Sequence, residues 1–485
     1  MPLKKTTTRR SFLRQSGLAA TAAATGPLLM GTRASGEVRG ANDRFRVAIA
    51  GINGRGRNHI SSFNDIDGVE IAYLVDPDAN VLANRLNDLG GNTKGVADIR
   101  EVLDDPDVDA VSIATPNHWH SLMTIWSAQA GKHVYVEKPI SHDVFEGRVV
   151  CEAQKKYGVV IQHGTQRRSS AGLAGLNEAI HAGEFGRLKI SYGYACKKRN
   201  GIGHHDPSEP PSHLDWDLWQ GPAEVGDFHR NMVHYNWHWF WSAGNGDLNN
   251  QGTHQLDVAH WALDPGVGHP VRVMALGGRF KWNDQGETPN TMMGIAEFAN
   301  GQQMFFNVRN VDYDGYLHQV ENEYYFEDGG RIVGGEYFAA GSNQGERVRV
   351  SNGHVTSGGP YGSFVNACRA GDPSMANGDA EVAHFGSVVG HLMNNSYRLG
   401  EQVPFNKKAG RFGDNKDAYE HFEKFHDLMA NDAGVPEDEE QYTVGPWLEF
   451  DPETERHVGE HADAANALLR KPVRKGYEIP EPDKV

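Results

Sequence analysis

One short segment restricts the possible folds of this chain more than any other. An apolar run at residues 45–50 predicts a buried strand, and it is followed at once by the sequence GINGRG and then by a predicted helix. Glycines at such a junction let the backbone turn tightly and approach a pyrophosphate at the helix N-terminus. Asn53 replaces the second glycine of the GxGxxG pattern, but Asn tolerates positive φ better than other non-glycine residues. A plain strand–loop–helix turn fits this segment alone equally well. The candidate dinucleotide contacts are Gly51, Asn53, Gly54, Arg55 and Gly56.

An acidic residue ends the second predicted strand, at residues 69–75. Asp76 lies 20 residues beyond Gly56, where a carboxylate can bind the ribose hydroxyls of an adenosine. Because a carboxylate repels a 2′-phosphate, NAD is favoured over NADP as the cofactor. Arg55 and Arg57 weaken that preference.

Strands and helices continue to alternate up to about residue 165. Further strands are predicted at 108–114, 132–136 and 159–162, with helices at 118–130 and 142–157. Repeated βαβ units imply a parallel sheet with helices on both faces, which binds ligands at the carboxyl ends of its strands.

The pattern changes after residue 165. Longer alternating segments predict strands at 188–195, 271–280, 292–298, 303–308, 324–326 and 331–333, before a late helix at 380–399. We therefore expect an α/β protein with a Rossmann domain (44–165) and an α+β domain (166–400) with a large, mostly antiparallel sheet. The charged, proline-containing residues 401–485 are expected to form a wrapping tail.

The N-terminus carries the features of an export signal. Residues 8–14 read TRRSFLR, a twin-arginine pattern, and an Ala-rich apolar run follows at residues 17–30. That run is too short to span a bilayer and contains Gly26 and Pro27. A small-residue stretch then offers a cleavage site, so residues 1–35 are expected to be a signal peptide and the protein to be periplasmic or otherwise exported.

Composition excludes several functions. The net charge of −16 argues against a nucleic-acid binder, although it does not exclude a small anionic substrate. The three cysteines are far apart and form no CxxC or zinc spacing. The sequence GHHD at 203–206 lacks a fourth ligand at metal spacing, so no metal is expected.

Two strand ends carry unusual motifs, TPNHWH at 115–120 and EKPI at 137–140. In this order, behind a dinucleotide loop, they resemble the Gfo/Idh/MocA family of glucose–fructose oxidoreductases and inositol dehydrogenases. The resemblance extends to WDLWQGPA at 216–223, GTHQLDVAHW at 252–261 and a tail at 465–474. It implies an oligomer formed through the open face of the C-terminal sheet. It also implies cofactor contacts from Thr115, Pro116, Asn117, His120, Glu137 and Lys138.

The expected chemistry rests on two residues. Lys138 can hold a substrate hydroxyl, and His254 can act as its base, because its ordinary pKa is about 6.5. Taken singly, a solvated lysine and a core histidine explain these residues as well; the two motifs together favour catalysis. Asn250 stands where many family dehydrogenases have Asp, and the nearby Asp247 and Asp257 are the candidates to take over the role of that carboxylate. Substrate contacts are expected from Tyr235, Trp239 and Asp257, of which Asp257 also fits a structural pair.

Three functions remain open from the sequence. The first is an NAD-dependent oxidoreductase acting on a sugar or polyol hydroxyl and exported with its cofactor. The second is an NAD-dependent glycoside hydrolase that oxidises, eliminates and reduces, an exception to the two-carboxylate hydrolases. The third is a non-catalytic NAD-binding protein, against which the presence of both Lys138 and His254 argues.

Overall fold

Six parallel strands form the first sheet of this computed structural model, which describes residues 44–316, 318–437 and 439–485. The predicted signal peptide lies outside the described residues. In spatial order the strands are β3 (Lys94–Val96), β2 (Val69–Val75), β1 (Phe45–Ala50), β4 (Ala110–Ile113), β5 (His133–Val136) and β6 (Ile161–His163). The intervening helices are α2 (Gly56–Asn64), α3 (Ala79–Leu89), α4 (Arg100–Leu103), α5 (Asn117–Gln129) and α6 (Val144–Tyr157). The predicted parallel sheet is confirmed, with β3, α3 and α4 as additions.

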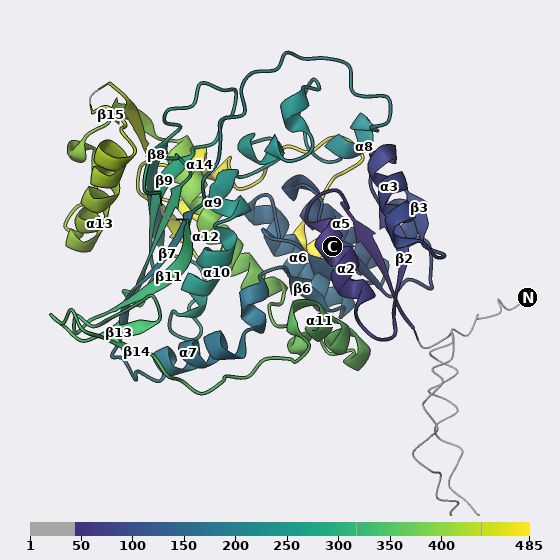
Figure 1. The fold of residues 1–485 in the computed structure, drawn as a ribbon, viewed down its shortest axis with the longest axis horizontal. Coiled ribbons are helices and arrows are strands. Elements are labelled where there is room, and N and C mark those ends of the chain that lie inside the picture. Colours follow the sequence, from purple (N-terminus) through teal and green to yellow (C-terminus); the bar gives the residue numbers. More distant parts are fainter. Residues whose placement is uncertain (1–43, 317, 438) are drawn as a thin grey trace, which may run out of the picture. The chain divides into compact units, whose positions relative to one another are not determined.

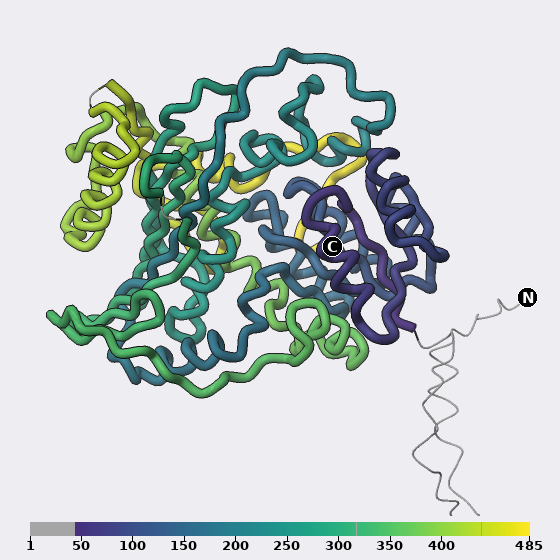
Figure 2. Tube along the Cα trace, viewed as in Figure 1, coloured from purple at the N-terminus to yellow at the C-terminus, as the bar shows by residue number. Residues whose placement is uncertain are grey.

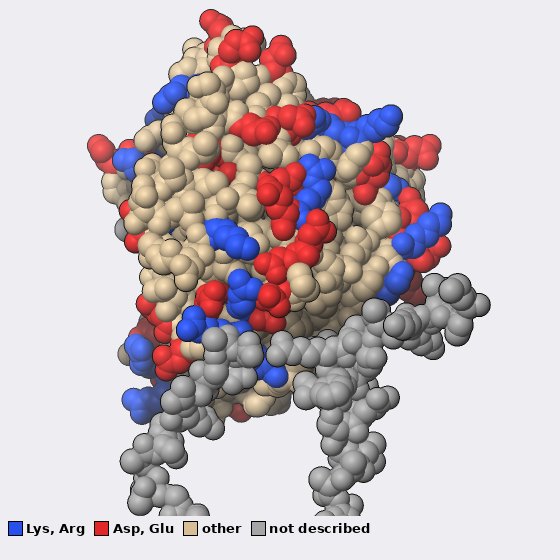
Figure 3. Space-filling view, turned by 90° about the vertical axis from the view of Figure 1, so that its right-hand side faces the viewer, with Lys and Arg blue, Asp and Glu red and all other residues tan. Residues whose placement is uncertain are grey.

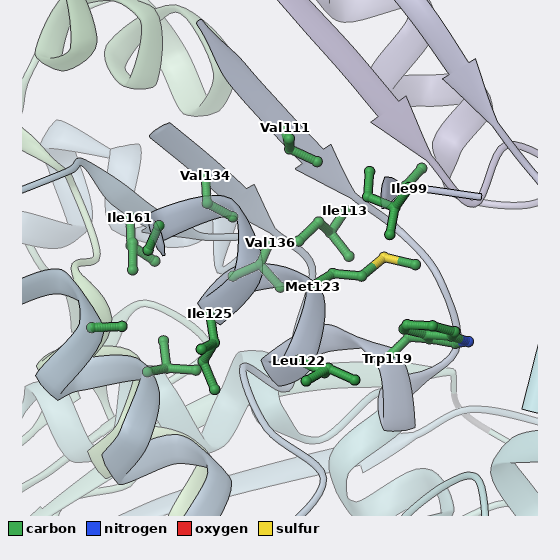
Figure 4. Close-up of a cluster of buried hydrophobic side chains, with 14 of the residues drawn as sticks. Ile99, Val111, Ile113, Trp119, Leu122, Met123, Ile125, Val134, Val136 and Ile161 are labelled. Carbon is green, nitrogen blue, oxygen red and sulfur yellow. The ribbon is translucent and has the colours of Figure 1, made fainter. Parts of the chain in front are cut away.

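The parallel strands are apolar because both of their faces are covered. Val111 and Val136 point toward the helix α5, where Leu122 and Ile125 complete a buried cluster (Figure 4). On the other face, Ile49 and Tyr135 pack with Phe364 of α11 (Gly359–Ala370). Burial on both faces explains why these strands read as continuous apolar runs.

A 12-stranded sheet dominates the rest of the chain. All of its pairings are antiparallel except that of β10 with β7. The predicted large, mostly antiparallel sheet is therefore confirmed. Its principal strands are β7 (Leu188–Cys196), β8 (Arg272–Gly278), β9 (Thr291–Glu297), β10 (Gln303–Arg309), β11 (Gln319–Phe326), β12 (Arg331–Val333), β13 (Glu336–Phe338) and β14 (Gly345–Arg347).

Helices cover both faces of this large sheet. The inner face packs against α10 (Thr253–Trp261) and α12 (Ala380–Arg398). On the outer face, Phe305 of β10 lies in one buried cluster with Phe422 of α13 (Lys416–Asp427) (Figure 1). The chain itself thus occupies part of the face expected to make an oligomer contact, and oligomer formation stays a prediction.

The segment after residue 400 joins the two sheets. Its strands β15 (Glu401–Pro404), β16 (Gln441–Val444), β17 (Leu448–Asp451) and β18 (Arg456–Val458) extend the large sheet, and α14 (Ala462–Asn466) follows. The chain then returns to the first domain (Figure 2), where Tyr477 and Val485 join the core cluster that contains Trp119. The C-terminal segment therefore packs into the core of the first domain as well as extending the large sheet.

None of the helices in the described ranges is long and apolar enough to cross a membrane. Acidic and basic side chains are interspersed over the face shown in Figure 3.

Candidate functional site

A cavity of ≈ 470 Å³ opens at the carboxyl ends of the parallel strands. Its wall is completed by the residues around α9 (Gly246–Asn250), by the N-terminal part of α10, and by residues near α8 (Trp216–Gln220). The structure brings most of the predicted site residues together here. They are Gly51, Asn53, Gly54, Arg55, Asp76, Thr115, Pro116, Asn117, His120, Glu137, Lys138, Tyr235, Asn250 and His254.

The glycine loop is shaped by two close backbone approaches. Gly51 has a φ of +78°, and a Cβ on it would lie 2.6 Å from the backbone between Ala114 and Thr115. A Cβ on Gly56 would lie 2.1 Å from the carbonyl oxygen of Gly51. Gly54, by contrast, has no neighbouring atom within 4 Å of a Cβ and leaves open space at the cavity wall. Gly51 and Gly56 therefore keep the loop tight, and Gly54 leaves room for a ligand.

Two polar groups fit the ribose and phosphate parts of a dinucleotide. The Asp76 carboxylate accepts hydrogen bonds from the backbone N–H groups of Ile52 and Asp78, both at 3.0 Å. Burial raises the pKa of Asp76 to about 6, so the group is mostly ionised at neutral pH. The hydroxyl of Thr115 is buried and has no partner among the described residues, although Thr115 lines the cavity. A buried unpaired hydroxyl at this edge is what a bound cofactor would satisfy.

Glu137 anchors the strand end beside the cavity. Its Oε1 atom accepts hydrogen bonds from Arg55 Nε at 3.0 Å and Gln166 Nε2 at 3.1 Å, and lies 3.2 Å from His59 Nε2. Burial alone would raise the pKa of Glu137, but the His59 contact and the charges of Arg55 and Lys138 hold it well below its usual range. The carboxylate therefore remains ionised and fixes both the glycine loop and the segment that carries Lys138.

The side chain of Lys138 reaches across the cavity to α9. Its Nζ donates to the backbone carbonyl of Asn250, and burial lowers its pKa while the charge of Glu137 opposes that shift. His120 lies behind it, with ring nitrogens 2.6 Å from Pro139 O and 2.8 Å from Thr115 O. Both neighbours are carbonyl acceptors, and because burial lowers the pKa of His120, the neutral ring donates its single N–H to one of them at a time.

His254 offers a free imidazole. Neither ring nitrogen has a hydrogen-bond partner in the part of the chain that the structure describes, and the residue lines the cavity. Burial, helped by the charge of Lys138, lowers the pKa of His254 to about 3. The ring is therefore neutral at physiological pH and has a nitrogen lone pair that can accept a hydrogen bond from a bound hydroxyl, although the lowered pKa makes it a weaker base than an ordinary imidazole.

Position 250 carries no carboxylate, but the nearby Asp247 does. Asn250 Nδ2 donates to Asp247 Oδ1 at 2.8 Å and to the Tyr235 hydroxyl at 3.2 Å. Asp247 is fully buried and also accepts hydrogen bonds from Arg199 at 3.1 and 3.2 Å and from Asn310 at 2.7 Å. Burial would raise the pKa of Asp247, but Arg199 and His238 hold it below its usual range. The negative charge of Asp247 thus lies behind Asn250, which itself lines the cavity.

Three predicted residues are not brought to the cavity. Asp257 is buried and pairs with Arg168 at 2.9 and 3.0 Å, so the structure gives it the structural role and not the predicted substrate contact. Trp239 is 2% exposed and packs edge-on against Trp282, also away from the cavity. Gly56 supports the loop from behind.

Comparisons with known proteins agree with this geometry. Residues 45–165 match the model of an oxidoreductase family with an NAD-binding Rossmann fold, and residues 219–331 match the GFO/IDH/MocA C-terminal domain. The chain belongs to the GFO/IDH/MocA oxidoreductase family. The expected NAD cofactor is thereby confirmed.

Individual relatives resemble parts of the chain. It is 31% identical over 186 residues to a 4-carboxy-2-hydroxymuconate-6-semialdehyde dehydrogenase from Sphingobium sp., covering 38% of this chain and 57% of the relative. It is 34% identical over 148 residues to a scyllo-inositol 2-dehydrogenase (NAD(+)) from Bacillus subtilis, covering 30% and 42%. It is also 31% identical over 160 residues to a glycosyl hydrolase family 109 protein from Shewanella pealeana, covering 28% and 35%. The chain thus spans 57% or less of the length of these relatives.

A solved structure shares the fold over a longer stretch. Levoglucosan dehydrogenase in complex with NADH and levoglucosan superposes with a TM-score of 0.53 at 18% identity. The match covers 72% of this chain and 96% of that protein.

Several lining residues of this GFO/IDH/MocA protein were not predicted. Lys197 follows β7 and lines the cavity together with Gln166, Trp219, Trp237 and Gln251. The motif at 216–223 was one available signal, because Trp219 belongs to it. The others come from segments distant in sequence, and no local pattern indicates their direction.

One cluster away from the cavity has metal-ligand residue types. The Oε1 atom of Glu455 lies 2.8 Å from His269 Nε2 and 3.0 Å from His384 Nε2. Arg148 donates to the same oxygen. With a guanidinium already at the carboxylate, this cluster is explained as a buried hydrogen-bond network.

Proposed function

We propose that this protein is an NAD-dependent dehydrogenase that oxidises a hydroxyl group of a sugar or another polyol. One observation carries the proposal: Lys138 and the unpaired ring of His254 line the same cavity as the cofactor-side groups Asp76 and Thr115. A donor and a base that line one cavity suit removal of a proton from an alcohol.

The side chains divide the work in this proposal. Bound NAD supplies the hydride acceptor. The ammonium of Lys138 donates a hydrogen bond to the substrate oxygen and stabilises the charge that develops on it. The neutral ring of His254 accepts the hydroxyl proton. Glu137, held ionised by Arg55 and His59, keeps the Lys138 segment in place.

The test is the absorbance of the purified mature protein with and without candidate sugars and polyols. Reduction of the nicotinamide is expected in the wild type. Lys138→Ala and His254→Ala should each lower turnover by about 10²–10⁴-fold while NAD still binds. Their effects should not add, because both residues act on one proton and one oxygen. Near-normal turnover in both variants would overturn the proposal.

A second candidate is an NAD-dependent glycoside hydrolase. It is favoured by the similarity to a glycosyl hydrolase family 109 protein and by the uncharged Asn250 beside the cavity. Here the cofactor would be oxidised and reduced within one cycle, so a chromogenic glycoside should be cleaved with no net change in nicotinamide absorbance. Net NADH accumulation from free sugars would decide for the dehydrogenase.

Export by the twin-arginine route is also part of the proposal. It is supported by the pattern at residues 8–14 and the apolar run at 17–30. Replacing Arg9 and Arg10 with Lys should leave the protein in the cytoplasm, as measured by cell fractionation. Unchanged periplasmic recovery would remove the assignment.

A further inference from the structure

Lys197 brings an ammonium group to the cavity wall. It directly follows β7, and its Nζ donates to the side-chain oxygen of Gln251 at 3.1 Å. No carboxylate of the described ranges lies within ion-pair distance of it, whereas the adjacent Lys198 pairs with Asp312 and Arg199 pairs with Asp247. Among these three consecutive cations, only Lys197 lines the main cavity.

The ammonium of Lys197 adds to positive charge already present at the reacting end. Its charge contributes to lowering the pKa values of both Lys138 and His254, so the three side chains interact across one space. Burial and the charge of Arg199 lower the pKa of Lys197 itself, while the buried Asp247 acts in the opposite direction. Lys138, Lys197 and His254 all line the cavity in which a substrate must lie.

The acids that line the cavity do not balance these charges. Glu137 is already held by Arg55 and His59. Asp76 accepts two backbone N–H groups at the end of β2, and Asp98 pairs with Arg100. A cation that is partly removed from water and lacks a counter-charge gains from an anionic ligand.

Building on the dehydrogenase function, we propose that the substrate is an anionic sugar or polyol and that Lys197 binds its charged group. The shared chemistry is an anionic oxygen group, either a carboxylate or a phosphate. The chain has a net charge of −16, which repels anions at long range, so recognition must come from this local reversal of charge. Lys197 is thus a specificity residue for the charged group, and Lys138 and His254 act on the hydroxyl.

Matched pairs of acidic and neutral sugars test this. D-glucuronate and D-galacturonate carry a carboxylate at C6, where D-glucose and D-galactose carry a neutral CH2OH group. D-glucose 6-phosphate carries a phosphate at the same carbon and is compared with D-glucose. Wild type, Lys197→Gln and the control Lys189→Gln are compared by NAD reduction. Lys189 lies in β7, is partly exposed and pairs with Asp417, so its variant removes the same charge away from the cavity. The unfolding temperature of the NAD-loaded proteins measures binding without turnover.

For an acidic substrate, Lys197→Gln should lower kcat/KM by about 10- to 100-fold, mainly through KM, because a charged hydrogen bond is lost. Turnover of neutral partners should stay unchanged, and Lys189→Gln should behave as wild type. If Lys197→Gln lowers kcat/KM only for D-glucose 6-phosphate, the charged group of the substrate is a phosphate. If no anion stabilises the wild type more than its neutral partner, or if Lys197→Gln weakens both equally, the proposal fails. Lys197-dependent stabilisation without NAD reduction would support the anion site and overturn the dehydrogenase function instead.

Discussion

Restoring the carboxylate that family dehydrogenases carry at position 250 should harm this protein. In the variant Asn250→Asp an oxygen takes the place of Nδ2, which now donates to Asp247 Oδ1 at 2.8 Å. At an effective dielectric constant of about 20, two unit charges at that distance repel by about 6 kcal/mol. Arg199, bound to Asp247, offsets part of this repulsion. The pKa of the new carboxyl group should therefore lie well above the ordinary carboxyl value, so the group keeps its proton at higher pH.

The sign of the pH dependence follows from that shift. A carboxyl group with a raised pKa binds more protons in the folded than in the unfolded protein, so stability is lost as the pH rises. The unfolding temperature of Asn250→Asp should approach that of the wild type near pH 4 and fall increasingly below it toward pH 8, which are approximate limits set by the ordinary carboxyl pKa.

Asn250→Ala serves as the control for this measurement. It removes the same hydrogen bonds to Asp247 and Tyr235 without adding a charge, so its deficit should not change with pH. If Asn250→Asp were as stable as the wild type at about pH 8 and also more active, the repulsion argument would be refuted. That result would mean that Asp247 does not carry a negative charge beside position 250.

Two further predictions concern the cofactor and the buried histidines. Asp76→Ala should bring the affinities for NAD and NADP closer together, measured by titration of nicotinamide fluorescence, because the variant no longer repels a 2′-phosphate; an unchanged ratio would contradict this. Burial lowers the pKa values of His118 and His384 to about 4 and that of His391 to about 3. Because the unfolded chain binds these protons first, stability should be complete above about pH 6.5 and fall toward pH 4. A constant unfolding temperature over that interval would count against buried neutral histidines.

Burial on both faces made much of the fold predictable. The runs at residues 45–50 and 69–75 agree with the structure at both ends, because such strands are mostly apolar, with Arg46 and Glu70 as exceptions near their starts, and are bounded by glycine or charged residues. The strand β3 was missed since its three residues, Lys94–Val96, form no apolar run and none of them is fully buried. The strands after residue 400 were missed for a related reason, because they are short and part of each faces water.

The cofactor side of the site was predictable and much of the substrate side was not. Thr115 and Lys138 directly follow parallel strands, so their place at the sheet edge is fixed by the local pattern alone. The partner of Asp257 is Arg168, 89 residues earlier in the chain, and only tertiary packing reveals that pair. The direction of Lys197 depends in the same way on Gln251, 54 residues later.

These long-range contacts explain how the site can function without a carboxylate at position 250. The acid beside Asn250 is Asp247, which Arg199 and Asn310 hold and which does not line the cavity. Asn250 then presents its backbone carbonyl to Lys138, while its side chain links Asp247 to Tyr235. Glu137, the acid beside Lys138 in the cavity wall, is already paired with Arg55 and His59. The ammonium of Lys197 is therefore left without a partner of opposite charge among the described residues, which suits the cavity to an anion.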